Sequence, residues 1–379
     1  MRILYISASS AVGGAQQALY NLASEMKARG HEVGVVLPDS KGVLYGKLQD
    51  AGCELFASER YVMTLYPMCY MPWKRRRANA LLKENFTRVR EYIGHILDEF
   101  RPDIVHTNVG PLDIAPAECA KRGIPHVWHL REYQRGMRFY PSADIFRKLV
   151  HESNNHCIAI SNGISDYWEL DAKKDRVIYD GVIPDTPGRP SSPNGGYFLF
   201  AGRVEKIKEV LPMLKAFRRY RSKGGGANLL IAGKDSGFYA LRCKLYAKLF
   251  LKDSVSFMGV CDGIGSLLDR AAALIAPCRC EGFGFTVVEA MHRNCPVIGF
   301  DACGIKEQFD KGLALTGDSI GMRFDSTDSL SERMLEVTKD GFNPADMTAR
   351  ALRTVMESYT ISHHTSQVEA FYKDILGHE

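Results

Sequence analysis

The sequence predicts an α/β protein with two doubly wound, parallel-sheet domains in tandem. Short apolar runs alternate with amphipathic helical segments along most of the 379 residues, which is typical of a parallel sheet covered by helices on both faces. One Pro/Gly/Ser-rich stretch, IPDTPGRPSSPNGG at 183–196, interrupts this alternation. Such stretches link domains, and a chain of this length can form two domains of ordinary size, so we place a domain boundary there.

The first domain is predicted at 1–185. It begins with an apolar strand at 3–7, followed by a Gly13-Gly14 turn and an amphipathic helix that ends at Gly30. Further apolar runs that predict strands lie at 31–37, 103–106, 125–130 and 157–161. Ligands of parallel sheets bind at the carboxyl ends of such strands, so the residues that follow these runs are candidates for a site.

The second domain is predicted at 186–355 and has the same alternation. A helix is predicted at 210–220, and strands at 197–201, 229–233, 255–257, 273–276 and 296–299. The last segment, 356–379, is predicted to form an amphipathic helix with Val368, Phe371 and Tyr372 on its apolar face. Two such domains in tandem leave a cleft between them, where small ligands usually bind.

The bulk composition restricts the class of protein. Hydrophobic residues make up 45% and charged residues 25% of the chain, which is ordinary for a soluble globular protein. No apolar run approaches the ~20 residues that cross a bilayer. The first residues form a strand rather than a signal peptide, so we expect a cytoplasmic protein whose ten cysteines are reduced. The chain has no Asp-x-Asp pair, so we expect neither a bound metal nor a cofactor.

Basic residues are concentrated in one window, from Arg60 to Arg90. This window holds eight basic residues and one acid, a net charge of +7. At its centre, Trp73 precedes the run Lys74, Arg75, Arg76 and Arg77. Basic residues beside aromatic ones suit a peripheral membrane contact or an acceptor, and a solvated loop followed by a surface helix explains the pattern equally well. No nucleic-acid-binding module accompanies the window, so nucleic acid is not an expected partner.

Two glutamates, Glu281 and Glu289, flank a Gly-Phe-Gly turn near the end of the second domain. A short strand precedes the turn and a helix follows it, so Glu281 lies in a strand-to-helix loop and Glu289 in the helix. The N–H groups of Gly284, Phe285 and Thr286 would point out of the helix N-terminus, where phosphate binds readily. Two carboxylates and a phosphate site suit a sugar nucleotide. The alternatives are a helix-dipole glutamate at 289 and an exposed loop charge at 281.

Cations follow the first strand of the second domain. Arg203 and Lys208 come just after the strand at 197–201, with Lys206 as an alternative to Lys208. Fixed cations at this point would stabilise the negative charge that develops on a nucleoside diphosphate leaving group.

The first domain offers two histidines and one glycine pair. His106 and His129 both fall at strand ends, where a histidine can hydrogen-bond a sugar hydroxyl or act as a base; for either one alone, a structural hydrogen bond is an equal alternative. His129 is the stronger candidate because Arg131 and Glu132 follow it. The Gly13-Gly14 turn can accept a phosphate through its N–H groups, although any tight strand-to-helix turn may need glycine.

Taken in order, these motifs resemble the retaining glycosyltransferases of family 4 over nearly the whole chain. The matching motifs are Gly13-Gly14, Asp103-Ile104-Val105-His106, His129, Ala159-Ile160-Ser161, Val177-Ile178-Tyr179-Asp180-Gly181-Val182, Gly202-Arg203 with Lys208, Glu281 with Glu289, Pro296-Val297-Ile298 and Gly304-Ile305-Lys306-Glu307. The resemblance implies the GT-B fold, in which two Rossmann-like domains face a cleft and the C-terminal helix crosses back to the N-terminal domain.

The resemblance also implies a role for each matched residue. Arg203 and Lys208 would bind the donor diphosphate, with Gly13 and Gly14 near it. Glu281 would contact the transferred sugar, Glu289 the ribose, and His129 would lie near the donor sugar. The family transfers sugar from a nucleotide donor with retention and without metal, so the implied partners are a nucleotide sugar and a glycan or lipid-linked glycan, at the cytoplasmic membrane face. The implied setting is surface polysaccharide synthesis.

The chain departs from the family pattern at three positions. The family usually has asparagine where Asp180 stands, near the hinge, and glycine where Glu209 and Cys303 stand. None of these departures removes a charge that the chemistry needs. Two alternative functions are a GT-B-fold isomerase of sugar nucleotides, which does not need the Arg203–Lys208 and Glu281–Glu289 combination, and a non-catalytic module that binds a sugar nucleotide or a membrane.

Overall fold

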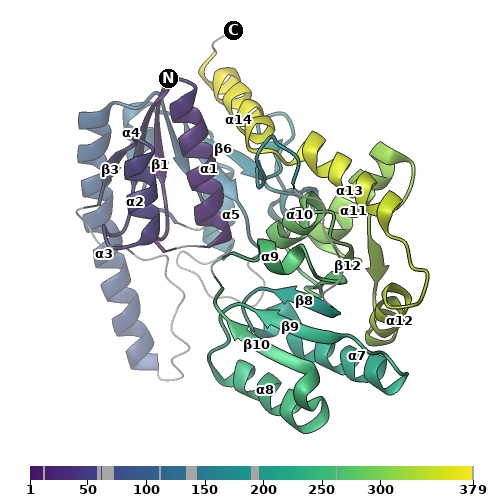
Figure 1. The fold of residues 1–379 in the computed structure, drawn as a ribbon. Coiled ribbons are helices and arrows are strands. Elements are labelled where there is room, and N and C mark those ends of the chain that lie inside the picture. Colours follow the sequence, from purple (N-terminus) through teal and green to yellow (C-terminus); the bar gives the residue numbers. More distant parts are fainter. Residues whose placement is uncertain are drawn as a thin grey trace. The chain divides into compact units, whose positions relative to one another are not determined.

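The computed structural model describes residues 1–11, 13–57, 61, 72–110, 112–133, 143–188, 196–261 and 263–377. It divides into two compact units, Met1–Gly181 with Ile361–Glu379, and Val182–Thr360 (Figure 1). The sequence predicted these boundaries between residues 185 and 186 and between residues 355 and 356. Each unit is a parallel sheet with helices packed on it, which confirms the predicted fold class.

The first unit contains a seven-stranded sheet in the order β3-β2-β1-β4-β5-β6-β7, and every pairing in it is parallel. Its strands are β1 (Arg2–Ile6), β2 (Glu32–Val36), β3 (Glu54–Phe56), β4 (Ile104–Thr107), β5 (His126–Leu130), β6 (Asn155–Ala159) and β7 (Arg176–Val177). The central strands β4 and β5 are buried along their whole length. Burial on both faces explains why these strands have nearly continuous apolar sequences rather than alternating ones.

Helices cover both faces of this sheet. They are α1 (Gly14–Ala28), α2 (Val43–Asp50), α3 (Pro72–Phe100), α4 (Pro116–Arg122), α5 (Ala143–Val150), α6 (Asn162–Trp168) and α14 (Ile361–Leu376). On one face, Leu19 and Leu22 of α1 share a buried cluster with Phe371 of α14. On the other face, Val89 and Ile93 of α3 pack with strand residues in a second cluster.

The C-terminal helix α14 belongs to the first unit although it follows the second in the chain. Its residues Val368, Phe371 and Tyr372 lie on one face at helical spacing and are at most 3% exposed. They pack against α1 and complete the core of the first unit. The predicted crossing of the last helix to the N-terminal domain is therefore confirmed.

The second unit contains a six-stranded parallel sheet in the order β10-β9-β8-β11-β12-β13. Its strands are β8 (Tyr197–Ala201), β9 (Asn228–Ala232), β10 (Val255–Gly259), β11 (Ala273–Ala276), β12 (Val297–Phe300) and β13 (Met322–Phe324). Its helices are η1 (Lys206–Lys208), α7 (Val210–Ser222), α8 (Phe238–Phe250), η2 (Lys252–Ser254), α9 (Gly265–Leu268), α10 (Phe285–His292), α11 (Cys303–Thr316), α12 (Thr327–Val337) and α13 (Ala345–Ser358).

The order of both sheets reverses at one point, between β1 and β4 in the first unit and between β8 and β11 in the second. Loops that leave such neighbouring strands in opposite directions form the ligand site of doubly wound folds.

The sequence did not predict β3, β7 and β13, which have only two or three residues, because such short runs carry no periodicity. Among the described residues, no helix combines the length and the apolar character needed to span a bilayer.

Replacing Phe371 by alanine is expected to lower the free energy of unfolding by about 3–5 kcal/mol, because it removes a buried ring from the α1–α14 contact. Urea denaturation measures the change. Gln367→Ala is the matched control, since Gln367 lies on the exposed face of the same helix. A loss below about 1 kcal/mol for Phe371→Ala would show that α14 does not contribute to this core.

Candidate active site

The Glu281 loop of the second unit leaves the end of β11 and enters α10. Gly284 immediately precedes α10 and has φ 102°, a left-handed conformation that favours glycine. The first turns of α11 hold the loop in place: the Gly304 N–H donates to the Glu281 carbonyl at 2.9 Å, and Gln308 Nε2 donates to the Phe283 carbonyl at 2.8 Å. A Cβ at Gly304 would lie 2.6 Å from the Gly282 carbonyl oxygen, so only glycine permits this close approach.

Lys208 and Glu281 form an ion pair at this edge of the sheet. Lys208 Nζ donates to Glu281 Oε2 at 2.6 Å, and the two side chains are 25% and 24% exposed. Burial opposes the charged form of Lys208, but the neighbouring Glu281 carboxylate outweighs it and raises the lysine pKa. The structure thus brings together two residues that the sequence separates by more than seventy positions, and it places a charged cation and a carboxylate side by side.

Arg203 follows β8 in a loop that backbone hydrogen bonds attach to the end of β9. The Gly202 N–H donates to the Ala232 carbonyl and the Val204 N–H to the Lys234 carbonyl, both at 2.8 Å. The Arg203 side chain is exposed and pairs with Glu205 at 2.9 Å. Exposed pairs of this kind contribute at most about 1 kcal/mol, so an anionic ligand can compete for Arg203 at little cost. Lys206 is also exposed.

Glu289 and the start of α10 lie beyond the same loop. Glu289 is half-buried, and burial raises the pKa of its carboxyl group. Phe285 and Thr286 are the first two residues of α10. Their N–H groups have no acceptor within the helix because the helix begins there. The strand-to-helix geometry expected around the two glutamates is therefore present.

Four described non-glycine residues of this unit adopt left-handed backbone conformations, and Glu209 and Cys303 are two of them. Glu209, at the end of η1, has φ 53°, and Cys303, at the start of α11, has φ 51°. These are the positions where the family pattern usually has glycine, and the left-handed conformation is the physical reason for that preference. The departures at Glu209 and Cys303 preserve the backbone shape at a cost in strain.

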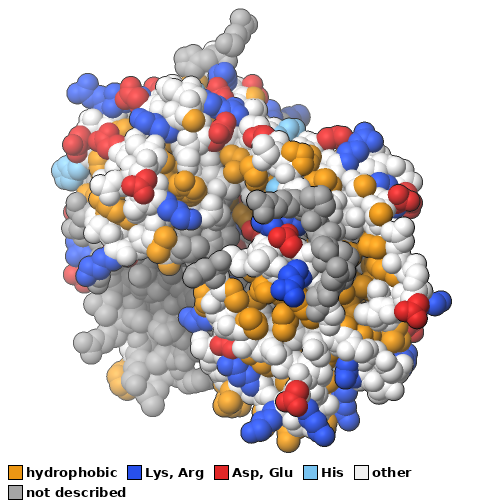
Figure 2. All heavy atoms as spheres, in the orientation of Figure 1, with side chains coloured by type: hydrophobic (Ala, Val, Ile, Leu, Met, Phe, Trp, Pro, Cys, Tyr) orange, Lys and Arg blue, Asp and Glu red, His pale blue; other side chains and the backbone are white. Residues whose placement is uncertain are grey.

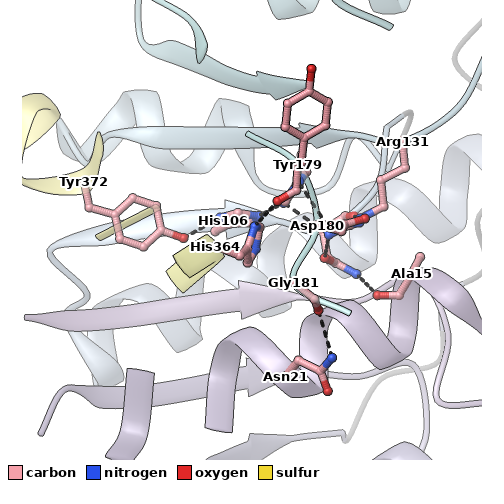
Figure 3. Close-up of polar contacts among 11 residues, drawn as sticks. Ala15, Asn21, His106, Arg131, Tyr179, Asp180, Gly181, His364 and Tyr372 are labelled. Atoms are coloured by element: carbon pink, nitrogen blue, oxygen red, sulfur yellow. Dashed lines mark hydrogen bonds and ion pairs between the residues drawn. The ribbon is translucent and has the colours of Figure 1, made fainter. Parts of the chain in front are cut away.

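In the first unit, the two candidate histidines, His106 and His129, are fully buried. They belong to one polar network, in which Figure 3 labels His106, Arg131, Asp180, His364 and Tyr372. His106 Nδ1 contacts the Tyr372 hydroxyl, and His106 Nε2 lies 3.2 Å from His129 Nδ1. Arg131 Nη2 lies 3.2 Å from the same His129 nitrogen, and Arg131 forms a buried ion pair with Asp180. The network therefore joins strands β4 and β5 to helix α14 and to the segment that follows β7.

The hydrogen-bond partners fix the protons of this network. Arg131 can only donate, so His129 Nδ1 accepts and the His129 proton is on Nε2. His106 Nε2 then also donates to His129 Nδ1, and His106 Nδ1 accepts from the Tyr372 hydroxyl. Burial, together with the charge of Arg131, lowers the pKa of both histidines well below the usual value. Both rings are neutral, and the Nε2–H of His129 faces the Asp180 carboxylate at 3.8 Å.

Asn108 and Asp180 hold Arg131 from two sides. Arg131 Nε donates to the Asn108 carbonyl at 2.9 Å and Nη2 donates to its side-chain oxygen at 3.1 Å. Asn108 Nδ2 in turn donates to the carbonyl of Ala15, in the first turn of α1, at 2.8 Å. A buried guanidinium needs a counter-charge, which Asp180 provides where the family pattern usually has the neutral asparagine.

Sequence reasoning missed Asn108, His364 and Tyr372 as members of this network. His364 Nδ1 donates to the Tyr179 carbonyl at 2.7 Å, and its ring stacks on His129 at 5.9 Å. A signal existed for Asn108, a polar residue directly after a buried strand. His364 and Tyr372 lie on the apolar face of α14, so only the crossing of that helix brings them to His106 and His129.

The glycine turn and the basic window are partly described. Gly13 precedes α1 in an extended conformation, and its carbonyl accepts the Gln17 N–H at 2.8 Å; Gly14 is the first residue of α1. On α3, Trp73 is 61% exposed and Arg76 is exposed. The side chains of Lys74, Arg75 and Arg77, and residues 62–71, lie outside the described residues.

Two sequence families match consecutive parts of this chain. Residues 12–186 match "Glycosyltransferase Family 4", and residues 187–354 match "Glycosyl transferases group 1". The chain belongs to the GT-B glycosyltransferases of the family 4 type. It is 28% identical over 175 residues to N-acetyl-alpha-D-glucosaminyl L-malate synthase of Bacillus anthracis, covering 45% of this chain and 43% of that protein.

Another relative of this glycosyltransferase is the Vi polysaccharide biosynthesis protein VipC/TviE of Salmonella typhi. It is 25% identical over 278 residues, covering 68% of this chain and 46% of that protein. The matches thus span about half the length of the curated relatives. Solved structures share the fold: a glycosyltransferase from Rickettsia africae ESF-5 has a TM-score of 0.78 at 16% identity, covering 100% and 99% of the two chains. Anabaena HepE in complex with UDP and glucose has a TM-score of 0.76 at 17% identity, covering 98% of each chain.

Replacing Glu209 by glycine is expected to raise the free energy of unfolding by roughly 0.5–1 kcal/mol, because glycine adopts the left-handed conformation without strain. Thermal denaturation checks the sign. Glu205→Gly is the matched control: Glu205 has an extended φ of −123°, so glycine there should destabilise. Equal effects of the two substitutions would contradict the strain argument.

The glycosyltransferase is expected to lose stability as pH falls below about 6.5. The folded pKa values of His106, His129 and His364 lie below the unfolded ones. As pH falls, the unfolded state therefore binds protons that these rings do not bind in the folded protein, which destabilises the folded protein by up to about 1.4 kcal/mol per pH unit for each histidine. His364→Asn keeps the donor to Tyr179 and should remove one such contribution from the slope between pH 6 and 5. Urea denaturation at each pH measures the free energy of unfolding, from which the slope follows.

The control for this pH series is Gln367→Ala, because Gln367 is an exposed residue of the same helix and has no titratable side chain. It should leave the pH slope of wild type unchanged. If His364→Asn has the wild-type slope as well, His364 takes up its proton in the folded protein and the neutral network is wrong.

Proposed function

We propose that this protein transfers a sugar from a nucleoside-diphosphate sugar to a glycan or lipid-linked glycan, with retention at the anomeric carbon and without a metal ion. The observation that carries the proposal is the Lys208–Glu281 ion pair at 2.6 Å. It lies next to the N-terminus of α10, at the carboxyl ends of strands β8 and β11. Cation, carboxylate and free helix N–H groups are the groups that a sugar diphosphate requires.

In this proposal the cations bind the donor diphosphate. Arg203 and Lys208 offset the negative charge that grows on the diphosphate as the bond to the sugar breaks, and Lys206 is the alternative to Lys208. The N–H groups of Phe285 and Thr286, with Gly284 beside them, complete the phosphate site. A diphosphate that attracts Lys208 weakens its bond to Glu281 and releases that carboxylate for the sugar.

The carboxylates bind hydroxyl groups. Glu281 accepts hydrogen bonds from the transferred sugar, and Glu289 binds the ribose. From the first unit, Gly13 and Gly14 contribute to diphosphate binding and His129 contributes a neutral imidazole, with His106 and Asp180 holding it through the buried network. Arg131 keeps His129 Nδ1 as an acceptor, so the imidazole can donate only from Nε2.

The proposed reaction needs no protein nucleophile. The bond between the anomeric carbon and the diphosphate oxygen breaks, and the acceptor oxygen bonds to the same face of that carbon. The acceptor proton passes to the departing phosphate oxygen. Arg203 and Lys208 stabilise the leaving group through charge alone, so the proposal assigns no bound cofactor or metal.

The relatives suggest the setting of the reaction. Similar proteins include the O-antigen chain mannosyltransferase RfbU of Salmonella typhimurium, 28% identical over 177 residues and covering 43% of this chain and 49% of that protein. Anabaena HepE was solved with UDP and glucose. We therefore place this enzyme in surface polysaccharide biosynthesis at the cytoplasmic face of the membrane, with UDP as the first nucleotide to test. The basic run that follows Trp73 on α3 is proposed to contact the acceptor or anionic lipid.

Glu281→Gln and Arg203→Ala are each expected to lower the transfer rate at least ~100-fold without unfolding the protein, because these groups act on transition-state charge and position. Glu336→Gln and Arg219→Ala are matched controls on exposed parts of the same unit and should keep wild-type rates. Wild-type turnover by either site variant would remove that residue from the mechanism.

The first experiment is a thermal-shift screen against UDP, GDP, ADP and CMP and their sugar conjugates, without added metal. A nucleotide that binds only the folded protein stabilises it by about 2.7 kcal/mol at a hundred times its Kd. We expect one nucleoside diphosphate to raise Tm, and Arg203→Ala to reduce the shift. If every nucleotide leaves Tm unchanged with and without an EDTA pre-treatment, the donor site is wrong.

A further inference from the structure

Helix α8 of the second unit has an apolar stripe on its solvent face. Phe238, Leu241, Leu245 and Leu249 are 84%, 63%, 55% and 62% exposed. Their spacing of three, four and four residues aligns them along one side of the helix. Isolated exposed leucines are ordinary, but a continuous row of large apolar side chains marks an interaction surface.

The fold does not use this stripe. The opposite side of α8 carries Ala240, Cys243 and Ala247, which are buried against the sheet. At 100° per residue, Leu245 points away from Cys243. The small residues already attach the helix to the second unit, so the outer row adds nothing to the core and must be explained by a partner.

Basic residues flank the stripe, and no acid interrupts them. Between residues 238 and 252 the chain has Arg242, Lys244, Lys248 and Lys252 and neither aspartate nor glutamate. Arg242, Lys248 and Lys252 are exposed, and Lys244 pairs with Asp235 at 2.7 Å. Figure 2 shows basic and hydrophobic side chains, with an acidic one among them, along the lower edge, where Figure 1 places α8.

We propose that α8 is a membrane-docking helix that lies flat on an anionic bilayer. Its thirteen residues form a rod of about 20 Å, too short to span the hydrocarbon core. The four apolar side chains enter the boundary between headgroups and acyl chains, and the flanking lysines and arginine contact anionic headgroups. This inference stands apart from the donor chemistry, since none of its residues belongs to the site of Arg203, Lys208 and Glu281.

Charge argues for lipid rather than a second copy of this chain. Two copies that met through their α8 stripes would bring Arg242, Lys248 and Lys252 of each copy against like charges, which opposes association. An anionic surface accepts the same cations favourably. A bilayer also accommodates four side chains in a row without a matching groove.

The experiment is flotation of this protein with two kinds of vesicle. One is made of phosphatidylcholine alone, and the other also contains about 30% phosphatidylglycerol, which makes its surface strongly anionic. Wild type is expected to float only with the anionic vesicles, and less at high salt because salt screens the attraction. Leu241→Ser/Leu245→Ser/Leu249→Ser and, separately, Lys248→Glu/Lys252→Glu are each expected to reduce the partition coefficient at least ~10-fold.

Two control variants make the test specific. Leu313→Ser removes an exposed leucine (47% exposed) from α11 of the same unit and should float like wild type. Reversal of Lys74, Arg75, Arg76 and Arg77 tests the α3 run: if it alone abolishes flotation while both α8 variants float normally, α8 does not bind the bilayer. All α8 variants should retain the wild-type nucleotide-induced shift in Tm, so loss of flotation is separable from loss of the donor site.

Other outcomes would overturn the proposal. If the wild-type protein floats with neither kind of vesicle, the proposal is wrong. Light scattering of the soluble protein that shows a dimer, converted to monomer by the triple leucine variant, would make a second copy the occupant of α8. Flotation that survives the leucine substitutions but is lost with the two charge reversals would mean that α8 only attracts the surface electrostatically and does not insert.

Discussion

Parallel pairing of every strand is the constraint on which the site depends. A parallel strand must be followed by a crossover connection, so all strands of a sheet end at the same edge and their loops gather there. In the second unit this places Arg203 and Lys208, which follow β8, beside Glu281, which follows its neighbour β11. In the first unit it places His106 of β4 beside His129 of β5. Residues distant in sequence thereby become neighbours.

The two units use charge in different ways. In the second unit the charged groups are partly exposed and paired with one another: Arg203 with Glu205 and Lys208 with Glu281. The exposed Arg203–Glu205 pair exchanges partners at small cost, which suits the proposed binding of a diphosphate. In the first unit Arg131 and Asp180 are buried, where removal of one partner leaves an uncompensated charge and costs about 3–5 kcal/mol. That pair supports rigid positioning of the histidines.

The glycine departures show which features of the family pattern are backbone requirements. Gly304 cannot carry a side chain because the Gly282 carbonyl occupies the space. Glu209 and Cys303 need only a left-handed φ, which other residues adopt at a cost of about 1–2 kcal/mol. The first kind of position excludes every residue but glycine, and the second tolerates substitution. The second unit therefore keeps the geometry of its loop although two of the expected glycines are absent.

The sequence by itself determined the two parallel-sheet units, most of their strands, the strand-to-helix loop of Glu281 and the helix that holds Glu289. These features follow from local periodicity and from glycine positions, which act over a few residues. Only the tertiary structure decided the partners of His129, because they come from β4, from the segment after β7 and from α14. Contacts between residues so distant in the chain leave no local pattern. The outward direction of the α8 stripe was likewise decided by which face of that helix the sheet buries.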